Sequence, residues 1–489
     1  MKPLTLNKTR FAAGALALFA LSLPAQAYLP FVDDDDDEEE EESKEVPEEE
    51  KDQYLLVHNA DIHTGAGEVL RGASLLSKNG KIAEIGYDLE VPGRDFFTEI
   101  PEEERDFRLR TIDAQGMRVY PGIVVISSSG LTGTGGDFRD SINPFSQNMV
   151  LGLAAGITTT GSGRAAVKLK RYVEQEPPLP YDFDGVVLSE STYASVSYTS
   201  SSARRSAREK FARAAEYLRE YRAWQTLVKK DKELKEPDKK GVDSTTLEIL
   251  QGAVFARFRA SERDDLLNIA MLAQEYNFRP IIEGCREGWT VADDLGRAGA
   301  MAIITPRERR DKDERLVREG GSSIENAAIL SKAGVQVAVV PQSKGVSLDG
   351  IVGRDIMHLP VEVGFAIRGG LSDDLAMASI TTVPARMMGI GHRVGTLEIG
   401  KDADLIVTDG DLLHYQTFVQ YTVIDGQLVY DKQQELYFSH IRPRAEAEPK
   451  VELAPEEVLD AGENPDEDGD EGEEHTDGDD DEGGEGDDD

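Results

Sequence analysis

From residue 121 onward, short apolar segments alternate with segments of helical periodicity, and this alternation restricts the fold more than any other feature. A strand that is followed by a helix runs parallel to the next strand, because only a long crossover connects parallel neighbours. The expected strands are residues 123–126, 156–160, 185–188, 253–258, 280–284, 300–305 and 335–340. The expected helices are residues 206–227, 264–275, 290–298 and 323–333. These strands approach an eight-stranded β/α barrel, so the predicted fold class is α/β.

Short β-rich runs flank this region on both sides. Asn79 and Gly80 form a hairpin signal near the start of the core, and Asp425 and Gly426 form another near its end. The first part predicts a small antiparallel sheet, and the second part returns to the same pattern of short strands and tight turns. The expected domains are a small β-sandwich built from residues 54–120 and 391–440, and a (β/α)8 TIM-like barrel of residues 121–390.

Most of the formal charge of −39 lies near the two ends of the chain. Residues 31–52 carry 15 acidic residues against two lysines, and residues 446–489 carry 23 against one lysine. Such segments repel themselves and have no apolar surface to bury, so we expect residues 28–53 and 445–489 to be disordered. Two roles are open for these segments: weak binding of divalent cations or basic partners, or simple solvation of the protein. We favour solvation. Nucleic acid is excluded as a partner, because binding it requires basic charge.

The first 27 residues have the three-part layout of a secretory signal peptide. A basic stretch over residues 2–10 precedes an apolar run over residues 11–23, and small residues follow up to Ala27. The alternative is a membrane anchor, but this run is shorter than the roughly 20 apolar residues that span a bilayer. We therefore expect cleavage after Ala27, no membrane span after cleavage, and export to the periplasm or to the medium.

Several motifs resemble those of the amidohydrolase superfamily, closest to its imidazolonepropionase-like branch. Residues 59–65 and 79–86 are similar to the opening β-sandwich of that family, and residues 154–160 are similar to its second barrel strand. The most specific motifs are residues 381–386 (TTVPAR), 395–407 (GTLEIGKDADLIV) and 424–429 (IDGQLV). The resemblance covers residues 54–432. It implies a fold more strongly than an activity, because function depends on the site and not on the scaffold.

Members of the superfamily bind zinc or another divalent metal at the C-terminal mouth of the barrel and activate a water that attacks a C–N bond. The resemblance assigns the ligand positions of this chain to Ser127, Ser129, Arg259, Gly284 and Gln342. The chain also has no histidine between His63 and His358. Zinc and nickel centres of this type need several imidazoles. We therefore predict no catalytic residue, no metal and no cofactor at these positions.

Arg259 leaves two alternatives for the predicted mouth of the barrel. With Ser127, Ser129 and Gln342 it could form a pocket for carboxylate or phosphate groups. Alternatively, it pairs with Glu283 or Glu287 and plugs the barrel. The single cysteine, Cys285, excludes an intrachain disulfide and offers a candidate nucleophile, but no histidine lies near it in sequence, so we favour a buried structural role.

Three hypotheses for the function follow. The first is an exported, metal-free amidohydrolase relative that acts as a non-catalytic binding or partner subunit, as a homo-oligomer or in a hetero-oligomer with an active amidohydrolase. The second is a hydrolase of non-peptide C–N bonds whose site is unrecognised or is completed by a partner. The third is a small-molecule anion-binding protein that uses Arg259.

Overall fold

The structure is a computed structural model, and it describes residues 52–89, 107–133, 142–172, 181–183, 185–229, 234–347, 353–435 and 438–440. The predicted signal peptide and the predicted acidic tail of residues 445–489 lie outside these residues. All described residues belong to one compact unit, Lys51–Asp489. Asp52 and Gln53, which belong to the segment predicted to be disordered, are part of a strand. Asp52 is fixed there by Lys78 of the next strand, with 2.7 Å between Oδ2 and Nζ.

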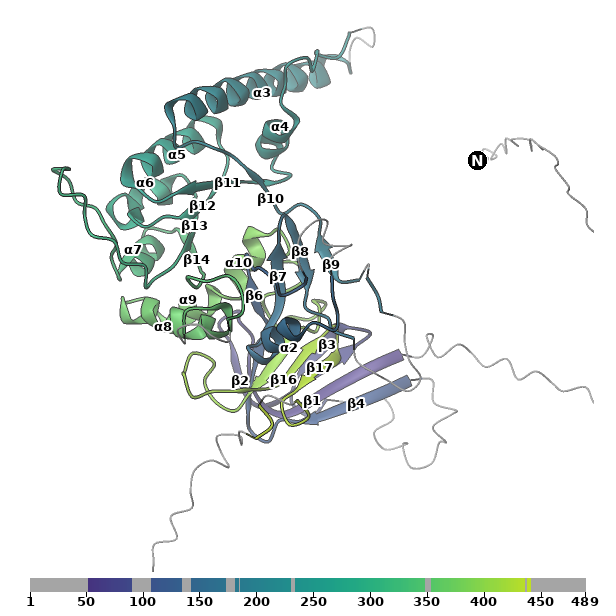
Figure 1. Ribbon diagram of the computed structural model, residues 1–489. Coiled ribbons are helices and arrows are strands. Elements are labelled where there is room, and N and C mark those ends of the chain that lie inside the picture. Colours follow the sequence, from purple (N-terminus) through teal and green to yellow (C-terminus); the bar gives the residue numbers. More distant parts are fainter. Residues whose placement is uncertain are drawn as a thin grey trace, which may run out of the picture. The chain divides into compact units, whose positions relative to one another are not determined.

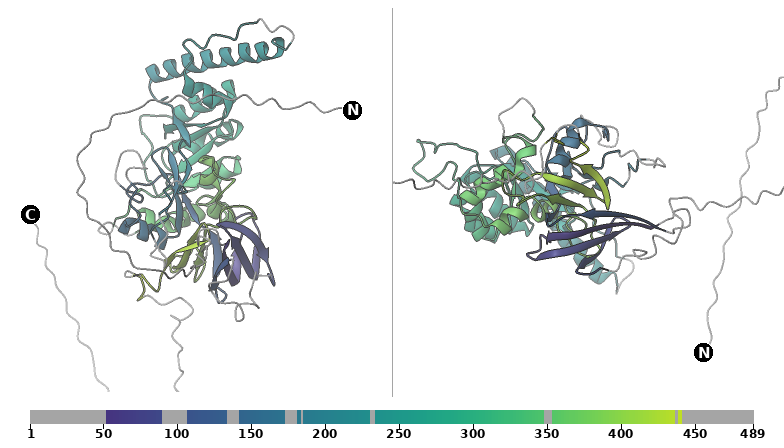
Figure 2. Two further views of the ribbon diagram at one scale, coloured as in Figure 1. Left: turned by 90° about the vertical axis from the view of Figure 1, so that its right-hand side faces the viewer. Right: turned by 90° about the horizontal axis from the view of Figure 1, so that it is seen from below.

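One mixed sheet takes its strands from both ends of the described chain (Figure 1). Its members are β1 (Asp52–His63), β2 (Val69–Lys78), β3 (Lys81–Gly86), β4 (Phe107–Asp113), β5 (Arg118–Pro121), β15 (Leu405–Thr408), β16 (Val419–Ile424) and β17 (Gln427–Asp431). The strand order is β17-β16-β15-β5-β1-β2-β3, and β4 pairs with β1. The antiparallel pair β5–β15 joins the first part to the last part, so purple and yellow-green strands lie side by side in Figure 2.

The prediction of an antiparallel sheet is wrong for two strand pairs, because β1 runs parallel to β4 and to β5. These strands are joined to β1 by long connections and not by hairpins. Both predicted hairpin signals are confirmed as turns. Asn79 and Gly80 have φ values of 48° and 79°, and Asp425 and Gly426 have values of 50° and 68°. Positive φ at both central residues is typical of the two-residue turns that join twisted strands.

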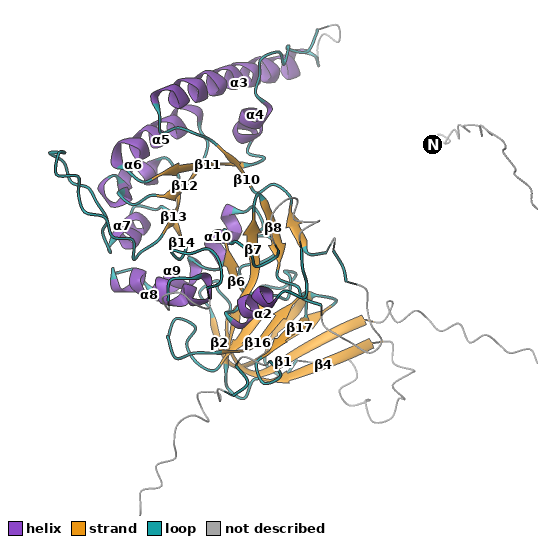
Figure 3. Cartoon of the chain, in the orientation of Figure 1, coloured by secondary structure: helices purple, strands orange, loops and turns teal. Residues whose placement is uncertain are grey.

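The middle of the chain forms two further sheets. The first contains β10 (Tyr193–Ser195), β11 (Phe255–Ala260), β12 (Pro280–Gly284), β13 (Met301–Ile304) and β14 (Gln336–Val339), all parallel. The second contains β6 (Ile123–Val125), β7 (Ile157–Ser162), β8 (Ala165–Lys168) and β9 (Val187–Ser189), with β8 antiparallel to both of its neighbours. Figure 3 shows helices in purple packed alongside strands β11–β14 in orange.

The predicted closed eight-stranded ring is not formed among the described residues, in which β9 does not pair with β10 and β14 does not pair with β6. Ser379 and Ile380 lie between β14 and β6 instead. The N–H of Val339 donates to the carbonyl of Ser379 at 3.1 Å, and the N–H of Val124 donates to that of Ile380 at 2.8 Å. A second reason for the open ring is the hairpin that places β8 antiparallel beside β7. At this point of the chain a turn stands where the predicted barrel has a β/α crossover.

The helices are α2 (Gln147–Ala154), α3 (Ser201–Leu227), α4 (Ser244–Gln251), α5 (Arg263–Tyr276), α6 (Ala292–Arg297), α7 (Asn326–Lys332), α8 (Leu359–Arg368), α9 (Asp373–Ala378) and α10 (Thr382–Met387), with the 3-10 turns η3 (Gly288–Thr290) and η4 (Ile356–His358). Helices α3 to α8 follow strands of the parallel sheet and contribute residues to the largest apolar core. Residues of α10 pack against the opposite face of β12, β13 and β14. None of the helices in the described ranges is both long and apolar enough to cross a membrane.

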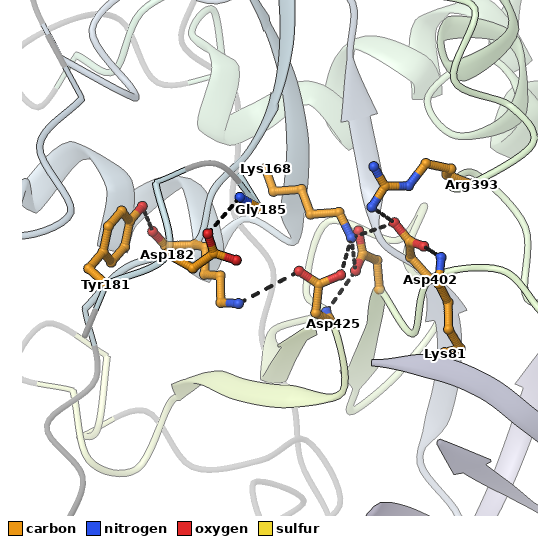
Figure 4. A network of polar contacts seen from close by, with 10 residues as sticks. Lys81, Lys168, Tyr181, Asp182, Gly185, Arg393, Asp402 and Asp425 are labelled. Carbon is orange, nitrogen blue, oxygen red and sulfur yellow. Dashed lines mark hydrogen bonds and ion pairs between the residues drawn. The ribbon is translucent and has the colours of Figure 1, made fainter. Parts of the chain in front are cut away.

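A fully buried lysine joins the β6–β9 sheet to the eight-stranded sheet (Figure 4). The ammonium group of Lys168 lies 2.8 Å from Asp402 Oδ2 and 2.9 Å from Asp404 Oδ1, and it also pairs with Asp425. Asp402 also forms ion pairs with two further cations, Arg393 at 2.8 Å and Lys81. Lys170 also lies 3.8 Å from Asp425, so three acids meet four cations, of which Lys168 is fully buried and Lys81 is half exposed.

The titration of these groups follows from their burial. Burial alone would lower the pKa of Lys168, but the three carboxylates outweigh it and hold that pKa above its ordinary value. Burial raises the pKa of Asp404 to about 6, although Lys168 opposes this shift. Burial would also raise the pKa of Asp402, but Lys168, Lys81 and Arg393 more than compensate, and the pKa is lowered.

Candidate functional site

The candidate site lies at the carboxyl ends of β11 and β12, where two arginines and a glutamate share one face. Arg257 and Arg259 are two residues apart on β11, so their side chains point to the same side of the sheet. Glu283 of β12 is the register partner of Arg259. Parallel strands place paired residues on the same face, and this geometry brings the three side chains together.

Glu283 is in contact with three cations. Its Oε2 lies 3.2 Å from Nη2 of Arg257 and 3.4 Å from Nη2 of Arg259, and its Oε1 accepts a hydrogen bond from Nζ of Lys344 at 2.6 Å. Lys344 comes from the segment that follows β14. Among the described residues, no other acid pairs with these three cations. The group, called here the Glu283 cluster (Arg257, Arg259, Glu283 and Lys344), therefore has an excess of positive charge.

Burial and charge act in opposite directions on Glu283. Burial alone would raise the pKa of this carboxyl, but the hydrogen bond from Lys344 and the charges of the arginines outweigh it, so the pKa lies below 4.5. Glu283 therefore stays ionised at neutral pH. Arg257 is buried, and its guanidinium carbon lies 4.4 Å from the centre of the Tyr193 ring. The Arg259 side chain is 82% exposed, so the cluster combines a fixed inner cation with an outer cation that solvent reaches.

The structure brings only some of the predicted site residues to this cluster. Arg259 pairs with Glu283, as one alternative required, and not with Glu287. Glu287 instead accepts hydrogen bonds from the backbone N–H groups of Arg263 and Gly321. Ser129 lies beside the cluster, because its N–H donates to the carbonyl of Lys344 at 2.9 Å.

The other predicted positions contribute less. Gln342 is exposed, and neither it nor the partly buried Ser127 makes a side-chain hydrogen bond or ion pair within the described part of the chain. Gly284 ends β12 with φ 102°, and a Cβ atom there would lie 2.5 Å from Oγ of Ser261. A side chain at that position would be strained by the positive φ and would displace the Ser261 hydroxyl.

Sequence reasoning missed Arg257 as a member of the site. The signal was present, since two arginines separated by one residue on a strand must share a face. The predicted strand ended at residue 258, whereas β11 continues to Ala260, and this left Arg259 outside the expected strand. The role of Lys344 could not be inferred, because its contact with Glu283 joins residues 61 positions apart.

Comparisons with known proteins bear on this arrangement. Residues 314–430 match the sequence model of the amidohydrolase family. A segment of 99 residues is 33% identical to amidohydrolase tasK of Hapsidospora irregularis, which amounts to 20% of this chain and 10% of that protein. A segment of 68 residues is 43% identical to N-acetylglucosamine-6-phosphate deacetylase of Danio rerio, or 14% of this chain and 16% of that protein. The chain thus spans only a small part of either relative.

A solved structure is similar over most of the chain. The crystal structure of an amidohydrolase from Thermotoga maritima MSB8 matches with a TM-score of 0.54 and 21% identity, covering 77% of this chain and 100% of that one. The family match supports a relationship to the amidohydrolases for residues 314–430, less than half of the chain. The structural likeness implies an α/β fold that contains a TIM barrel. The imidazolonepropionase-like branch stays a prediction.

The residues that the resemblance assigns to the metal-ligand positions do not fit a divalent metal. Gly284 has no side chain, and the guanidinium of Arg259 repels a cation. In the ranges that the structure describes, no three His, Cys, Asp or Glu side chains form a group that could hold a metal ion. What the arrangement can do is bind negative charge, because arginine and lysine side chains donate charge-assisted hydrogen bonds to carboxylate and phosphate oxygens.

Cys285 directly follows Gly284 but is not available as a nucleophile. Its side chain is fully buried, and burial raises the pKa of its thiol to about 12. The thiolate that a nucleophilic cysteine needs is therefore scarce at neutral pH. The backbone of Cys285 has a structural role instead, since its carbonyl accepts a hydrogen bond from Nδ2 of Asn326 at 3.0 Å.

Proposed function

We propose that this amidohydrolase relative binds a small organic anion, in the first place a carboxylate, at the Glu283 cluster and does not hydrolyse a C–N bond there. The observation that carries the proposal is the contact of one carboxylate with three cations at the ends of β11, β12 and β14. The resemblance to amidohydrolases implies a metal ion at these same strand ends. A fixed group of cations replaces the divalent ion as the source of positive charge.

The geometry supports a carboxylate ligand in particular. Glu283 contacts only one side of each cation, and most of the Arg259 side chain stays exposed. A guanidinium offers five N–H donors in a planar fork, so it can hold Glu283 and a second carboxylate at the same time. Arg257 adds charge from inside and cannot move away, because Tyr193 packs against it.

A screen of carboxylates and phosphate by thermal shift, followed by calorimetry, tests this proposal. We expect binding that weakens about tenfold in Arg259→Ala, since a hydrogen bond between charged groups contributes about 1.5 kcal/mol. Arg315→Ala is the matched control, because Arg315 is also exposed (88%) and also pairs with an acid, Asp313. An anion-induced shift that is the same in Arg259→Ala as in the wild type would contradict the proposal.

The second candidate is a hydrolase of non-peptide C–N bonds with a site completed by a partner. It is favoured by the family match over residues 314–430 and by the similarity of short segments to an amidohydrolase and a deacetylase. Metal analysis of the purified protein after extensive dialysis separates the candidates. Stoichiometric zinc, nickel or manganese would favour the hydrolase.

We also infer that the protein is exported and works in the periplasm or in the medium, as a homo-oligomer or with an active amidohydrolase as partner. The support is the signal-peptide pattern of residues 1–27 and the lack of ligating residues at the candidate site. Mass spectrometry of the mature N-terminus and co-purification test these inferences. A mature chain that still begins at Met1 would contradict export by cleavage.

A further inference from the structure

The long helix α3 is covered on two of its sides (Figure 1). One side packs against the body of the protein through buried residues that include Phe211 and Leu218. A second side is covered by the segment that begins at Leu234, whose carbonyl accepts a hydrogen bond from Nε1 of Trp224 at 3.0 Å. The remaining surface of the helix faces solvent.

Arginines line one edge of this solvent-facing surface. The arginine stripe, as we call it, consists of Arg205, Arg208, Arg219 and Arg222, all exposed. The four positions fall within about 100° of one another around the helix axis, because each residue turns the helix by about 100°. Among the described residues, none of the four lies within ion-pair distance of an acid, and Arg208 donates to the hydroxyl of Tyr198. By contrast, the other basic residues of α3, Arg204, Lys210 and Arg213, each pair with an acid.

The charge of this region is opposite to that of the rest of the protein. The described residues between 201 and 240 include 11 basic residues against five acidic ones. Residues 53–445 as a whole carry 48 basic residues against 55 acidic ones. The stripe therefore belongs to a basic region on an acidic protein, and its guanidinium groups are free to bind carboxylates.

The same chain carries a segment of complementary charge. Residues 460–489, outside the described part of the chain, contain 18 acidic residues and no lysine or arginine. The 49 residues from 441 to 489 would span about 160 Å if fully extended. A compact domain of about 390 residues has a radius of gyration of only about 21 Å. The segment is therefore long enough to reach any part of the surface of its own molecule.

We propose that residues 460–489 dock along the arginine stripe of α3 in the same molecule. A guanidinium can hold a carboxylate with two parallel hydrogen bonds, so arginine suits this contact better than lysine. A single exposed ion pair is weak. The segment offers many equivalent carboxylates, however, and its covalent link to the domain keeps their effective concentration high. Docking covers the basic region and closes it to other polyanions.

Energy transfer between two dyes on the full-length protein tests the proposal. The substitutions Ala223→Cys and Gly483→Cys give one attachment site beside the stripe and one in the acidic segment. The native Cys285 is buried, so it does not compete for the dyes. We expect high transfer efficiency in about 0.01 M salt, where the Debye length is about 30 Å. The efficiency should fall in about 1 M salt, where the Debye length is about 3 Å.

A matched pair of variants separates docking on the stripe from a general effect of charge. The test variant combines Arg205→Glu, Arg219→Glu and Arg222→Glu, and it should show in low salt the efficiency that the unsubstituted stripe shows in high salt. The control variant makes the same change of charge at three exposed arginines elsewhere, Arg297, Arg309 and Arg315. It should keep the high efficiency. Circular dichroism checks that both variants are folded.

Four outcomes would overturn the proposal. The first is low transfer in low salt, which would leave the stripe to solvent or to the acidic segment of residues 31–52. The second is an efficiency that does not depend on salt. The third is an equal efficiency in the test and control variants. The fourth is transfer of the same size between molecules that carry one dye each, which would assign the docked segment to a second copy of the chain.

Discussion

Lys168 and Glu283 are the centres of two charge clusters of opposite composition. Lys168 is one cation among three aspartates, whereas Glu283 is one carboxylate among three cations. Lys81, Lys170 and Arg393 pair with these aspartates from outside, and the Lys168 side chain at the centre is fully buried. The Glu283 cluster keeps its excess charge and opens to solvent through Arg259. A ligand cannot reach the buried central charge of the Lys168 network, whereas the exposed Arg259 leaves the Glu283 cluster open to one.

The largest expected effect is on stability at Lys168. Lys168→Met leaves three acids in a buried region without their central cation, so we expect the free energy of unfolding to fall by about 3–5 kcal/mol. Lys210→Met is the control, because the Lys210–Asp243 pair is exposed and such pairs contribute about 0–1 kcal/mol. Urea denaturation measures both. Equal losses in the two variants would show that the Lys168 network is not structural.

The same network should give a characteristic pH dependence. Asp404 has an ordinary pKa of 3.8 and a folded pKa of about 6, so its contribution to stability is complete below pH 3.8 and is lost as the pH rises to about 6. Asp404→Asn removes this loss. The variant should therefore gain about 3 kcal/mol relative to the wild type over this range.

Asp402→Asn is the counterpart of that experiment. The pKa of Asp402 is lowered, so its contribution to stability is present above pH 3.8 and is lost as the pH falls through the folded pKa. This variant should lose stability relative to the wild type as the pH rises through 3.8. Urea denaturation at a series of pH values measures both differences, and curves of the same sign for the two variants would contradict the assignment.

At the Glu283 cluster, removal of the central charge should matter less for stability and more for binding. Glu283→Gln leaves three cations together, and we expect the free energy of unfolding to fall by about 1–2 kcal/mol, because two of the three cations are partly or largely exposed. Added carboxylate should then raise the melting temperature of this variant more than that of the wild type. A smaller rise would mean that Glu283 belongs to the binding surface and does not compete with the ligand.

The smallest effect concerns Cys285. Because burial raises the pKa of its thiol to about 12, we expect iodoacetamide at pH 8 to label the folded protein far more slowly than the urea-unfolded protein. Mass spectrometry of the labelled protein measures the two rates. Labelling of the native protein at the rate of the unfolded one would reopen the nucleophile hypothesis for Cys285.

The sequence predicted local features well. Strand β12 covers the predicted residues 280–284, and the hairpin signals at Asn79 and Asp425 are turns, because strand periodicity and turn chemistry act over a few residues. Arg259 was found because the resemblance assigned it a position.

Long-range features escaped prediction. Lys168 lies 236 residues from Asp404, and no local pattern reports such a contact. Whether the middle sheets close into a ring depends on which strand edges pair. Ser379 and Ile380, which are 40 residues beyond β14 in sequence, lie between β14 and β6, and no local pattern predicts this. Arg257 could have been predicted from its spacing to Arg259, but only with the correct end of β11.

The most direct test of the central claim is an anomalous-scattering map from crystals soaked with 4-bromobenzoate and recorded at the bromine and zinc absorption edges. The account predicts a carboxylate held by Arg259 and Lys344, with a bromine peak beside it and no zinc peak. A zinc peak coordinated at residues 127, 259, 284 or 342, or a bromine peak only elsewhere on the protein, would contradict it.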